Sequence, residues 1–422
     1  MGSTFIRGVN LGSLFVPEKW MVPSFYAGSS ATSLCDLVHE NRMEAAARMR
    51  EHLDTFVRED DFAWLAARGF NAVRVPLGYW NVLGGTVGSL PRYVPEQPAD
   101  SLVVLDRIFQ WGQVHGMAVL LDLHGAPGSQ NGADHSGCNS FAIQWGTDAT
   151  VQFSLDTVHA LAQRYGRHPS LLGIELLNEP GWAVEWDHGR LLDYYTRALA
   201  IVRTFSTEAL VVFNVLFSDD FPAGFGNWWN GQLVAPNVVL DLHLYDCYDN
   251  SSQRTVAEHV AQARVWRSRI ETLQAQGHQV LIGEWSLATG MHPGGQAWAD
   301  AQLEAFSVSI GWFFWSFKKE GLYPGDDGGD TWTLQGALKS GIKGIDGGSK
   351  ALLEAQPVVR LVASASSIAS VPHFAWGIGS LVLGVVVGAA WARRARAVGS
   401  FYQSTCLHPT TGTYYLFSRV EE

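Results

Sequence analysis

Charged side chains are scarce in this chain. Asp, Glu, Lys and Arg make up 16% of its 422 residues, whereas ordinary soluble domains have about 25%. The 40 acidic residues outnumber the 29 basic ones, and the net charge is −11. A protein that binds nucleic acid needs a basic face to displace counterions from phosphates. This balance argues against nucleic acid as a partner.

One stretch has no charge at all. Residues 374–391 read FAWGIGSLVLGVVVGAAW, and three arginines follow within five residues. A helix of this length spans roughly 27 Å, which is enough to cross the apolar core of a bilayer. The basic flank and the tryptophans near both ends favour a membrane over a buried core helix. We expect one transmembrane helix over residues 374–391.

The N-terminal sequence lacks an export signal. MGSTFIRGVNLG has no basic start followed by an apolar run. The basic flank of the apolar stretch nevertheless predicts that the large N-terminal region lies outside the cell. We therefore expect a single-pass membrane protein with an extracellular domain, and a tail-anchored protein with a cytosolic domain is the alternative.

Cysteine is nearly absent. The chain has four cysteines, Cys35, Cys138, Cys247 and Cys406. The last lies beyond the expected span, so at most one disulfide forms among the other three. The number of cysteines does not decide whether the protein resides in an oxidising or a reducing compartment.

Aromatic residues are abundant, with 17 Trp, 12 Tyr and 21 Phe. So much apolar surface requires a large core and excludes a disordered chain. No Ser-, Pro- or charge-rich linker interrupts residues 1–360. We expect one domain there, a linker over residues 361–373 and a short tail over residues 392–422.

Eight short, mostly apolar runs alternate with segments of helical period. The runs begin at Phe5, Asn71, Ala118, Leu171, Leu210, Val238, Gln279 and Ile310. Continuous apolar runs are typical of parallel strands that are buried on both faces. Eight such repeats predict an α/β fold, a (β/α)₈ TIM barrel. Residues 13–59 form a long insertion after the first strand, and we expect it to cover the active-site face.

Several sequence motifs are missing. There is no GxGxxG after the first strand, no HExxH and no GxSxG. The acidic DDGGD segment at residues 326–330 lacks the register of a calcium loop. We therefore expect neither a cofactor nor a bound metal.

Two of the apolar runs end in a carboxylate, Glu179 in the fourth and Glu284 in the seventh. Catalytic residues of TIM barrels lie at the carboxyl ends of the strands, and strands four and seven lie roughly opposite each other. A carboxylate at the end of a buried strand is unfavourable unless it is paired or used. Two opposed carboxylates are the groups that hydrolyse glycosidic bonds. We therefore predict that both are catalytic.

Other polar residues lie at strand ends. They are Arg74 on the second run, His124 on the third, His243 and Tyr245 on the sixth, and Trp315 on the eighth. Arg74 and Tyr245 are candidates to hydrogen-bond a carboxylate. Asn178, next to Glu179, is a candidate to bond a sugar hydroxyl, and Trp315 offers a flat face to a sugar ring.

These motifs, taken in order, resemble glycoside hydrolase family 5, and most of all its exo-β-1,3-glucanase branch. The resemblance rests on RGVNLGSLFVPEKW, NAVRVPLGYW, LLDLHGAPGSQNGADHSG, LLGIELLNEP, LHLY, LIGEWS and GWFFWSFKKE, over about residues 5–335. It implies a (β/α)₈ barrel, a retaining mechanism and no cofactor.

The resemblance also assigns roles. It implies that Glu179 is the general acid/base, that Glu284 is the nucleophile and that Glu18 lines the pocket for the terminal sugar. Arg74, His124, Asn178, His243, Tyr245 and Trp315 match supporting positions. One loop departs from the branch, because ADHSG stands where it usually has FDNSG. Ala133 then replaces an aromatic clamp, and His135 replaces an asparagine as a polar contact with the substrate.

We predict a membrane-tethered retaining hydrolase that acts on β-glucan, most of all a glucan 1,3-β-glucosidase. The alternatives are a glucan transglucosylase, a hydrolase of glycolipids such as glucosylceramide, and an inactive sugar-binding surface protein.

Overall fold

Eight parallel strands form a closed barrel in the computed structural model of the protein. The structure describes residues 5–83, 98–138, 143–181, 188–214, 233–248, 251, 253–289, 295–321 and 330–347. The strands are β1 (Ile6–Asn10), β2 (Ala72–Gly78), β3 (Ala118–Gly125), β4 (Leu171–Glu175), β5 (Leu210–Asn214), β6 (Val238–Leu244), β7 (Gln279–Trp285) and β8 (Gly311–Phe314). The predicted (β/α)₈ barrel is confirmed.

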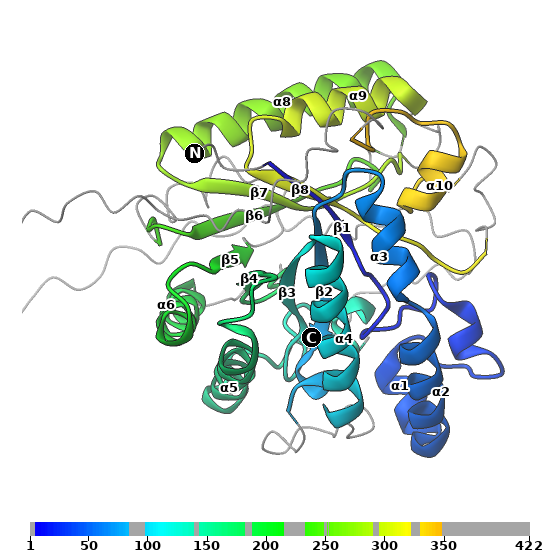
Figure 1. Ribbon diagram of the computed structural model, residues 1–422, viewed down its shortest axis with the longest axis vertical. Coiled ribbons are helices and arrows are strands. Elements are labelled where there is room, and N and C mark those ends of the chain that lie inside the picture. The colour runs from blue at the N-terminus through cyan, green and yellow to red at the C-terminus, as the bar shows by residue number, and fades with distance from the viewer. Residues whose placement is uncertain are drawn as a thin grey trace, which may run out of the picture.

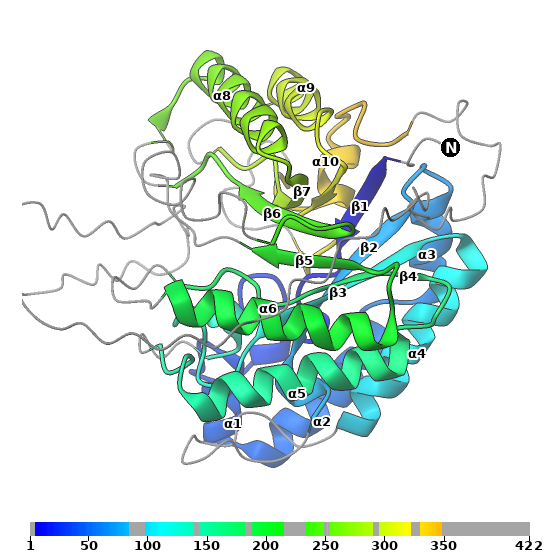
Figure 2. The ribbon, with the colours of Figure 1, turned by 90° about the vertical axis from the view of Figure 1, so that its left-hand side faces the viewer.

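Helices surround the barrel (Figures 1 and 2). They are α1 (Leu34–Glu40), α2 (Arg42–Thr55), α3 (Glu59–Ala66), α4 (Pro98–His115), α5 (Asp148–Tyr165), α6 (His188–Phe205), α8 (Val256–Ala275), α9 (Gly295–Phe306) and α10 (Leu334–Lys339). Local sequence fixes their ends. Helix α8, for example, begins in a capping box, in which Thr255 and Glu258 satisfy each other's backbone N–H groups.

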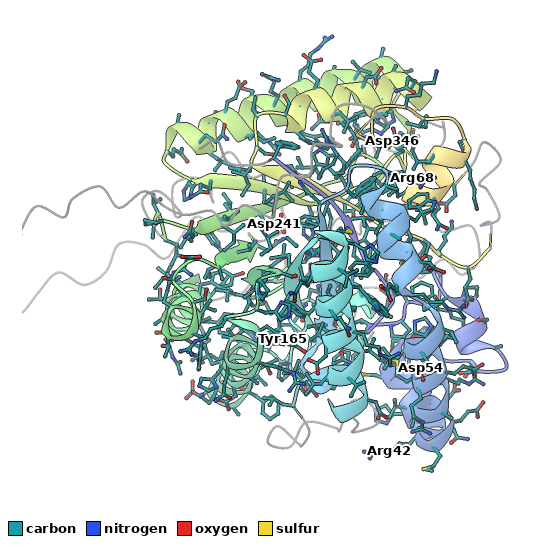
Figure 3. The ribbon with its side chains drawn as sticks, in the orientation of Figure 1. Arg42, Asp54, Arg68, Tyr165, Asp241 and Asp346 are labelled. Carbon is teal, nitrogen blue, oxygen red and sulfur yellow. A yellow bond between two sulfur atoms is a disulfide. The ribbon has the colours of Figure 1, made fainter. Side chains whose placement is uncertain are left out.

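The barrel interior has an apolar part and a polar part. Every second strand residue faces inward. Toward the amino ends, these positions pack into one apolar cluster of Ile6, Ala72, Ala118, Leu120, Leu210, Val212, Val239, Leu281 and Phe313. Toward the carboxyl ends the inward positions are buried polar residues, namely Asn10, Arg74, Asp122, Glu175, Asn214 and Asp241. The apolar cluster thus forms a floor beneath a polar layer. Figure 3 shows Asp241 among the strands and Tyr165 on the outer helices.

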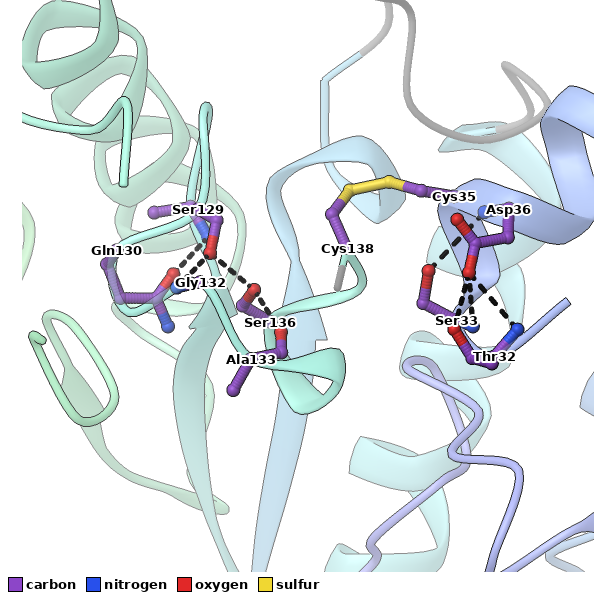
Figure 4. Close-up of a disulfide and its surroundings, with 11 residues drawn as sticks. Thr32, Ser33, Cys35, Asp36, Ser129, Gln130, Gly132, Ala133, Ser136 and Cys138 are labelled. Carbon is purple, nitrogen blue, oxygen red and sulfur yellow. Dashed lines mark hydrogen bonds between the residues drawn. A yellow bond between two sulfur atoms is a disulfide. The ribbon is translucent and has the colours of Figure 1, made fainter. Parts of the chain in front are cut away.

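The long insertion after β1 contains a 3₁₀ turn (Pro23–Tyr26), α1 and α2. A disulfide joins Cys35 of α1 to Cys138 in the loop after β3, with the two Cα atoms 5.0 Å apart (Figure 4). The backbone N–H of Cys35 also donates to the carbonyl of Gly137. The insertion is therefore fixed to the β3 loop, which carries His135.

The predicted linker over residues 361–373, the helix over residues 374–391 and the tail over residues 392–422 lie outside the described residues. The end of the predicted domain at residue 360 does so too. Within the part of the chain that the structure describes, no helix has both the length and the apolar character needed to cross a bilayer.

Candidate active site

All ten predicted site residues lie on strands or in the segments that follow their carboxyl ends. Arg74, His124, His243 and Glu284 are on strands β2, β3, β6 and β7. Asn178 and Glu179 follow β4, Tyr245 follows β6, and Trp315 follows β8. His135 is in a 3₁₀ turn after β3 (Asp134–Ser136), and Glu18 is in the insertion after β1. The barrel therefore gathers at one end residues that are up to 297 positions apart, from Glu18 to Trp315.

The two predicted catalytic carboxylates face each other. One oxygen of Glu179, one oxygen of Glu284 and a ring nitrogen of His243 all lie within 4.8 Å of one another. The Glu284 side chain is 6% exposed and that of Glu179 is 16% exposed. Both carboxylates therefore keep some contact with solvent.

Glu284 receives a hydrogen bond at each oxygen. Arg74 Nη1 donates to Oε1 at 2.8 Å, and the Tyr245 hydroxyl donates to Oε2 at 2.8 Å. Two fixed donors on one carboxylate set its orientation, and the guanidinium also compensates its charge. The predicted contacts of Arg74 and Tyr245 with a carboxylate are present.

Glu179 lies in a different environment. Its Oε1 is 2.6 Å from Nδ1 of His243, and its Oε2 is 3.3 Å from Nε2 of His135. Burial raises the pKa of the Glu179 carboxyl, but the hydrogen bond and charge of His243 outweigh burial and lower the pKa to about 2. The backbone of Glu179 has φ +40°, in the left-handed region that residues with side chains rarely adopt.

His243 connects the two carboxylates. Its Nδ1 is 2.6 Å from Glu179 and 3.5 Å from Glu284, and its Nε2 is 3.3 Å from Asp241. Burial lowers the pKa of the imidazole, but the surrounding carboxylates, Glu284 first, raise it well above its ordinary value. The ring therefore keeps a proton between the two acids.

A buried polar layer supports this site from below. The Arg74 guanidinium is fully buried and donates to Glu175, Asn10 and Asn178 as well as to Glu284. It also lies 3.1 Å from Asp122. One cation thus organises three carboxylates and two amides.

Sequence reasoning missed five members of this layer, namely Asn10, Asp122, Glu175, Asn214 and Asp241. A signal for two of them was present, because the tripeptide DLH occurs in both the third and the sixth run. Residues two apart on a strand share a face, so each Asp lies beside its His. His124 Nδ1 is 2.7 Å from Asp122.

Among the residues that the structure describes, the ligand-type atoms of this site form two groups of three. One is Glu175, Asp241 and His243, and the other is Glu179, His243 and Glu284. His243 belongs to both groups, and its raised pKa favours the protonated ring, which cannot ligate a metal. The arrangement therefore fits ion pairing and proton transfer better than metal binding.

Glu175 is expected to make stability depend on pH. Burial, followed by the nearby Asp122 and Asp241, raises the pKa of its carboxyl well above the ordinary value, although Arg74 opposes them. The folded state then holds the proton at pH values where the unfolded state has lost it, so this group destabilises the protein as pH rises through that window. The variant Glu175→Gln should gain melting temperature relative to the wild type as pH increases from 4 to 8. Glu51→Gln, exposed on α2, serves as the control, and a pH-independent difference for Glu175→Gln would contradict the assignment.

The remaining predicted residues line the same end of the barrel. Trp315 stacks on His124 with ring centroids 5.7 Å apart and an angle of 6° between the planes. The Glu18 carboxyl accepts a hydrogen bond from Trp20. Burial first, and then the charge of Asp134, raise the pKa of Glu18. Asp134 is therefore a further residue of this site that sequence reasoning did not select.

A (β/α)₈ barrel with two facing carboxylates at the ends of strands four and seven has the architecture of a glycosidase. The model of the family "Cellulase (glycosyl hydrolase family 5)" matches residues 42–321. The chain belongs to glycosyl hydrolase family 5, and it is an enzyme of the glycosidase class.

Similar proteins support this assignment. A probable glucan 1,3-beta-glucosidase A of Emericella nidulans is 33% identical over 383 residues, which cover 80% of this chain and 89% of that protein. A glucan 1,3-beta-glucosidase of Blumeria graminis is 29% identical and covers 80% of this chain and 86% of its own length. The crystal structure of rutinosidase from Aspergillus niger matches with a TM-score of 0.64 at 22% identity, covering 80% of this chain and 95% of that one. This last similarity concerns the fold alone.

Proposed function

We propose that this glycosidase is a retaining glucan 1,3-β-glucosidase that removes glucose from the end of a β-1,3-glucan. The observation that carries the retaining mechanism is the carboxylate pair, with an oxygen of Glu179 and one of Glu284 within 4.8 Å. Retaining glycosidases hold their carboxyl groups about 5–5.5 Å apart, whereas inverting enzymes leave about 6.5–9.5 Å for a water molecule. The short separation supports retention.

Glu284 is the nucleophile in this mechanism. Arg74 and Tyr245 fix its two oxygens, so that the carboxylate can attack the anomeric carbon as the bond to the leaving oxygen breaks. The product of this step is a glycosyl-enzyme ester.

Glu179 is the general acid and then the general base. With a pKa of about 2, its carboxyl does not hold a proton alone near neutral pH. The Glu179–His243 pair holds one instead, since their atoms are 2.6 Å apart and the pKa of His243 is raised. Such a pair titrates as a unit. Negative charge that develops on the leaving oxygen draws the proton through Glu179, and the carboxylate later accepts a proton from the attacking water.

Other residues bind the sugar. The Asn178 amide nitrogen is buried and has no hydrogen-bond partner among the described residues, which suits it to bond a sugar hydroxyl next to the reacting carbon. Glu18, whose raised pKa favours the protonated form, can donate as well as accept a hydrogen bond. Trp315 and His124 provide the flat surface beneath the ring.

A screen of substrates by linkage tests the proposal. The full-length protein in detergent is incubated with laminarin, cello-oligosaccharides and glucosylceramide, with Glu284→Gln as the blank. We expect glucose from laminarin, with the β-anomer formed first in proton NMR. Faster release from glucosylceramide would favour a glycolipid hydrolase, and longer oligosaccharides at high acceptor concentration would favour a transglucosylase. Initial formation of the α-anomer would contradict retention.

We further propose that residues 374–391 anchor the enzyme in a membrane with the barrel outside the cell. The uncharged stretch and its basic flank support this orientation. The disulfide between Cys35 and Cys138 supports it independently, because disulfides persist in oxidising compartments. Protease added to intact cells should degrade the barrel domain; protection until the cells are permeabilised would indicate a cytosolic domain.

A further inference from the structure

The Glu179 carboxylate lies between two imidazoles. Oε1 is 2.6 Å from Nδ1 of His243, and Oε2 is 3.3 Å from Nε2 of His135. His243 is a supporting residue that the family resemblance already predicts. His135 stands where the related branch usually has asparagine, so the second imidazole is a departure of this chain.

Asn131 competes for the same nitrogen of His135. Its Oδ1 accepts from the backbone N–H of Ala133 at 3.0 Å, and its Nδ2 donates to the carbonyl of Glu179 at 3.1 Å. These two bonds fix which end of the amide faces His135. The NH₂ group then lies 2.6 Å from Nε2, and it can bond this nitrogen only if the nitrogen carries a lone pair.

Nε2 of His135 cannot serve both partners at the same time. The Asn131 amide requires a lone pair, and the Glu179 carboxylate requires an N–H donor. We propose that His135 is a positioning residue that changes partner during the reaction. It is neutral and bonded to Asn131 while the Glu179–His243 pair holds its proton, and charged and paired with Oε2 once that proton has passed to the leaving group. This inference rests on the proposed acid/base role of Glu179.

The proton on His135 comes from solvent, since its side chain is 24% exposed. The charge that His135 gains then compensates the negative charge of Glu179. His135 does so at Oε2, the oxygen that His243 does not contact. The ionisable groups around this pair are His243, His124, Glu284, Glu18 and Asp134. His124 contributes a ring 5.7 Å from that of His135, and its own hydrogen bond is to Asp122. An asparagine at position 135 can hydrogen-bond but cannot carry a charge.

The pH dependence of two substrates tests the proposal. Full-length wild type, His135→Asn and His135→Ala are compared on phenyl β-glucoside, whose leaving group needs a proton, and on 2,4-dinitrophenyl β-glucoside, whose leaving group does not. Without the charge on His135, the Glu179–His243 pair should lose its proton at higher pH. We expect the alkaline limb of kcat/KM on the first substrate to move up by about 1 pH unit. The acidic limb of kcat on the second, where Glu179 acts as base, should move up by a similar amount.

The two variants separate charge from hydrogen bonding. Asn and Ala should give the same shift, because both remove the charge. The proposal would be overturned if neither limb of the pH profiles moved in either variant. It would also be overturned if the limbs moved in His135→Ala but kept their wild-type positions in His135→Asn. His159→Asn on α5 controls for loss of an unrelated histidine. If the wild type fails to turn over either glucoside, the proposed function fails; if it is active and the limbs do not move, only this inference fails.

Discussion

Replacing Glu284 with glutamine is expected to lower kcat on a β-glucoside on the order of 10⁴- to 10⁶-fold, as removal of a catalytic nucleophile does in other enzymes. The amide is nearly the same size as the carboxylate and can still accept one hydrogen bond from Arg74 or Tyr245. It cannot form a stable ester with the anomeric carbon. The loss should therefore appear in kcat with every leaving group, while laminarin still binds. Steady-state kinetics and isothermal titration with laminarin measure the two effects.

Folding must be separated from chemistry in this variant. The melting temperature of Glu284→Gln should stay within a few degrees of the wild type, and Glu51→Gln should keep wild-type kcat. Glu284→Gln with more than a tenth of wild-type activity on phenyl β-glucoside would show that another group attacks the sugar.

Replacing Arg74 with methionine is expected to destabilise the fold by about 3–5 kcal/mol, the usual penalty when one partner of a buried ion pair is removed. The guanidinium is fully buried and lies 3.1 Å or less from carboxylate oxygens of Asp122, Glu175 and Glu284. Without it, Asp122 and Glu284 must either remain charged in the interior or take up protons. Urea unfolding followed by tryptophan fluorescence gives the free energy, and kcat should fall as well because Glu284 loses a fixed donor.

The surface provides a matched comparison. Arg267 on α8 pairs with Glu271 at 3.0 Å, and both side chains are partly exposed, so Arg267→Met should change stability by about 0–1 kcal/mol. If Arg74→Met does not fold, Arg74→Lys takes its place, because lysine keeps the charge but lacks the several N–H donors of the guanidinium. The loss of stability in Arg74→Lys should lie between the loss expected for Arg74→Met and the loss in Arg267→Met. Equal stability of Arg74→Met and Arg267→Met would rule out the central role of Arg74.

The strand pattern predicted the barrel because each buried strand is a nearly continuous apolar run with a polar end. The same pattern identified Glu179 and Glu284, since both acids close such runs. Apart from Arg74, the layer beneath them was missed for a physical reason. Asp122 and Asp241 lie inside apolar runs, and their pairing with His124 and His243 follows only from the period of two along a strand.

Contacts between loops were beyond the reach of the sequence pattern. The position of Asn131 between His135 and the Glu179 backbone depends on how the β3 loop approaches the end of β4. The sequence limited the disulfide to one pair among three cysteines, but the choice of Cys35 and Cys138 depends on the path of the insertion.

The left-handed backbone of Glu179 places function and thermal stability in opposition at one position. A side chain held at φ +40° costs about 1–3 kcal/mol, and glycine or asparagine would relieve most of this strain. A laboratory evolution experiment that selects only for heat resistance should therefore lose the acid at position 179 early. Engineering a more durable enzyme from this scaffold requires that this residue be held constant while the rest of the barrel is allowed to vary.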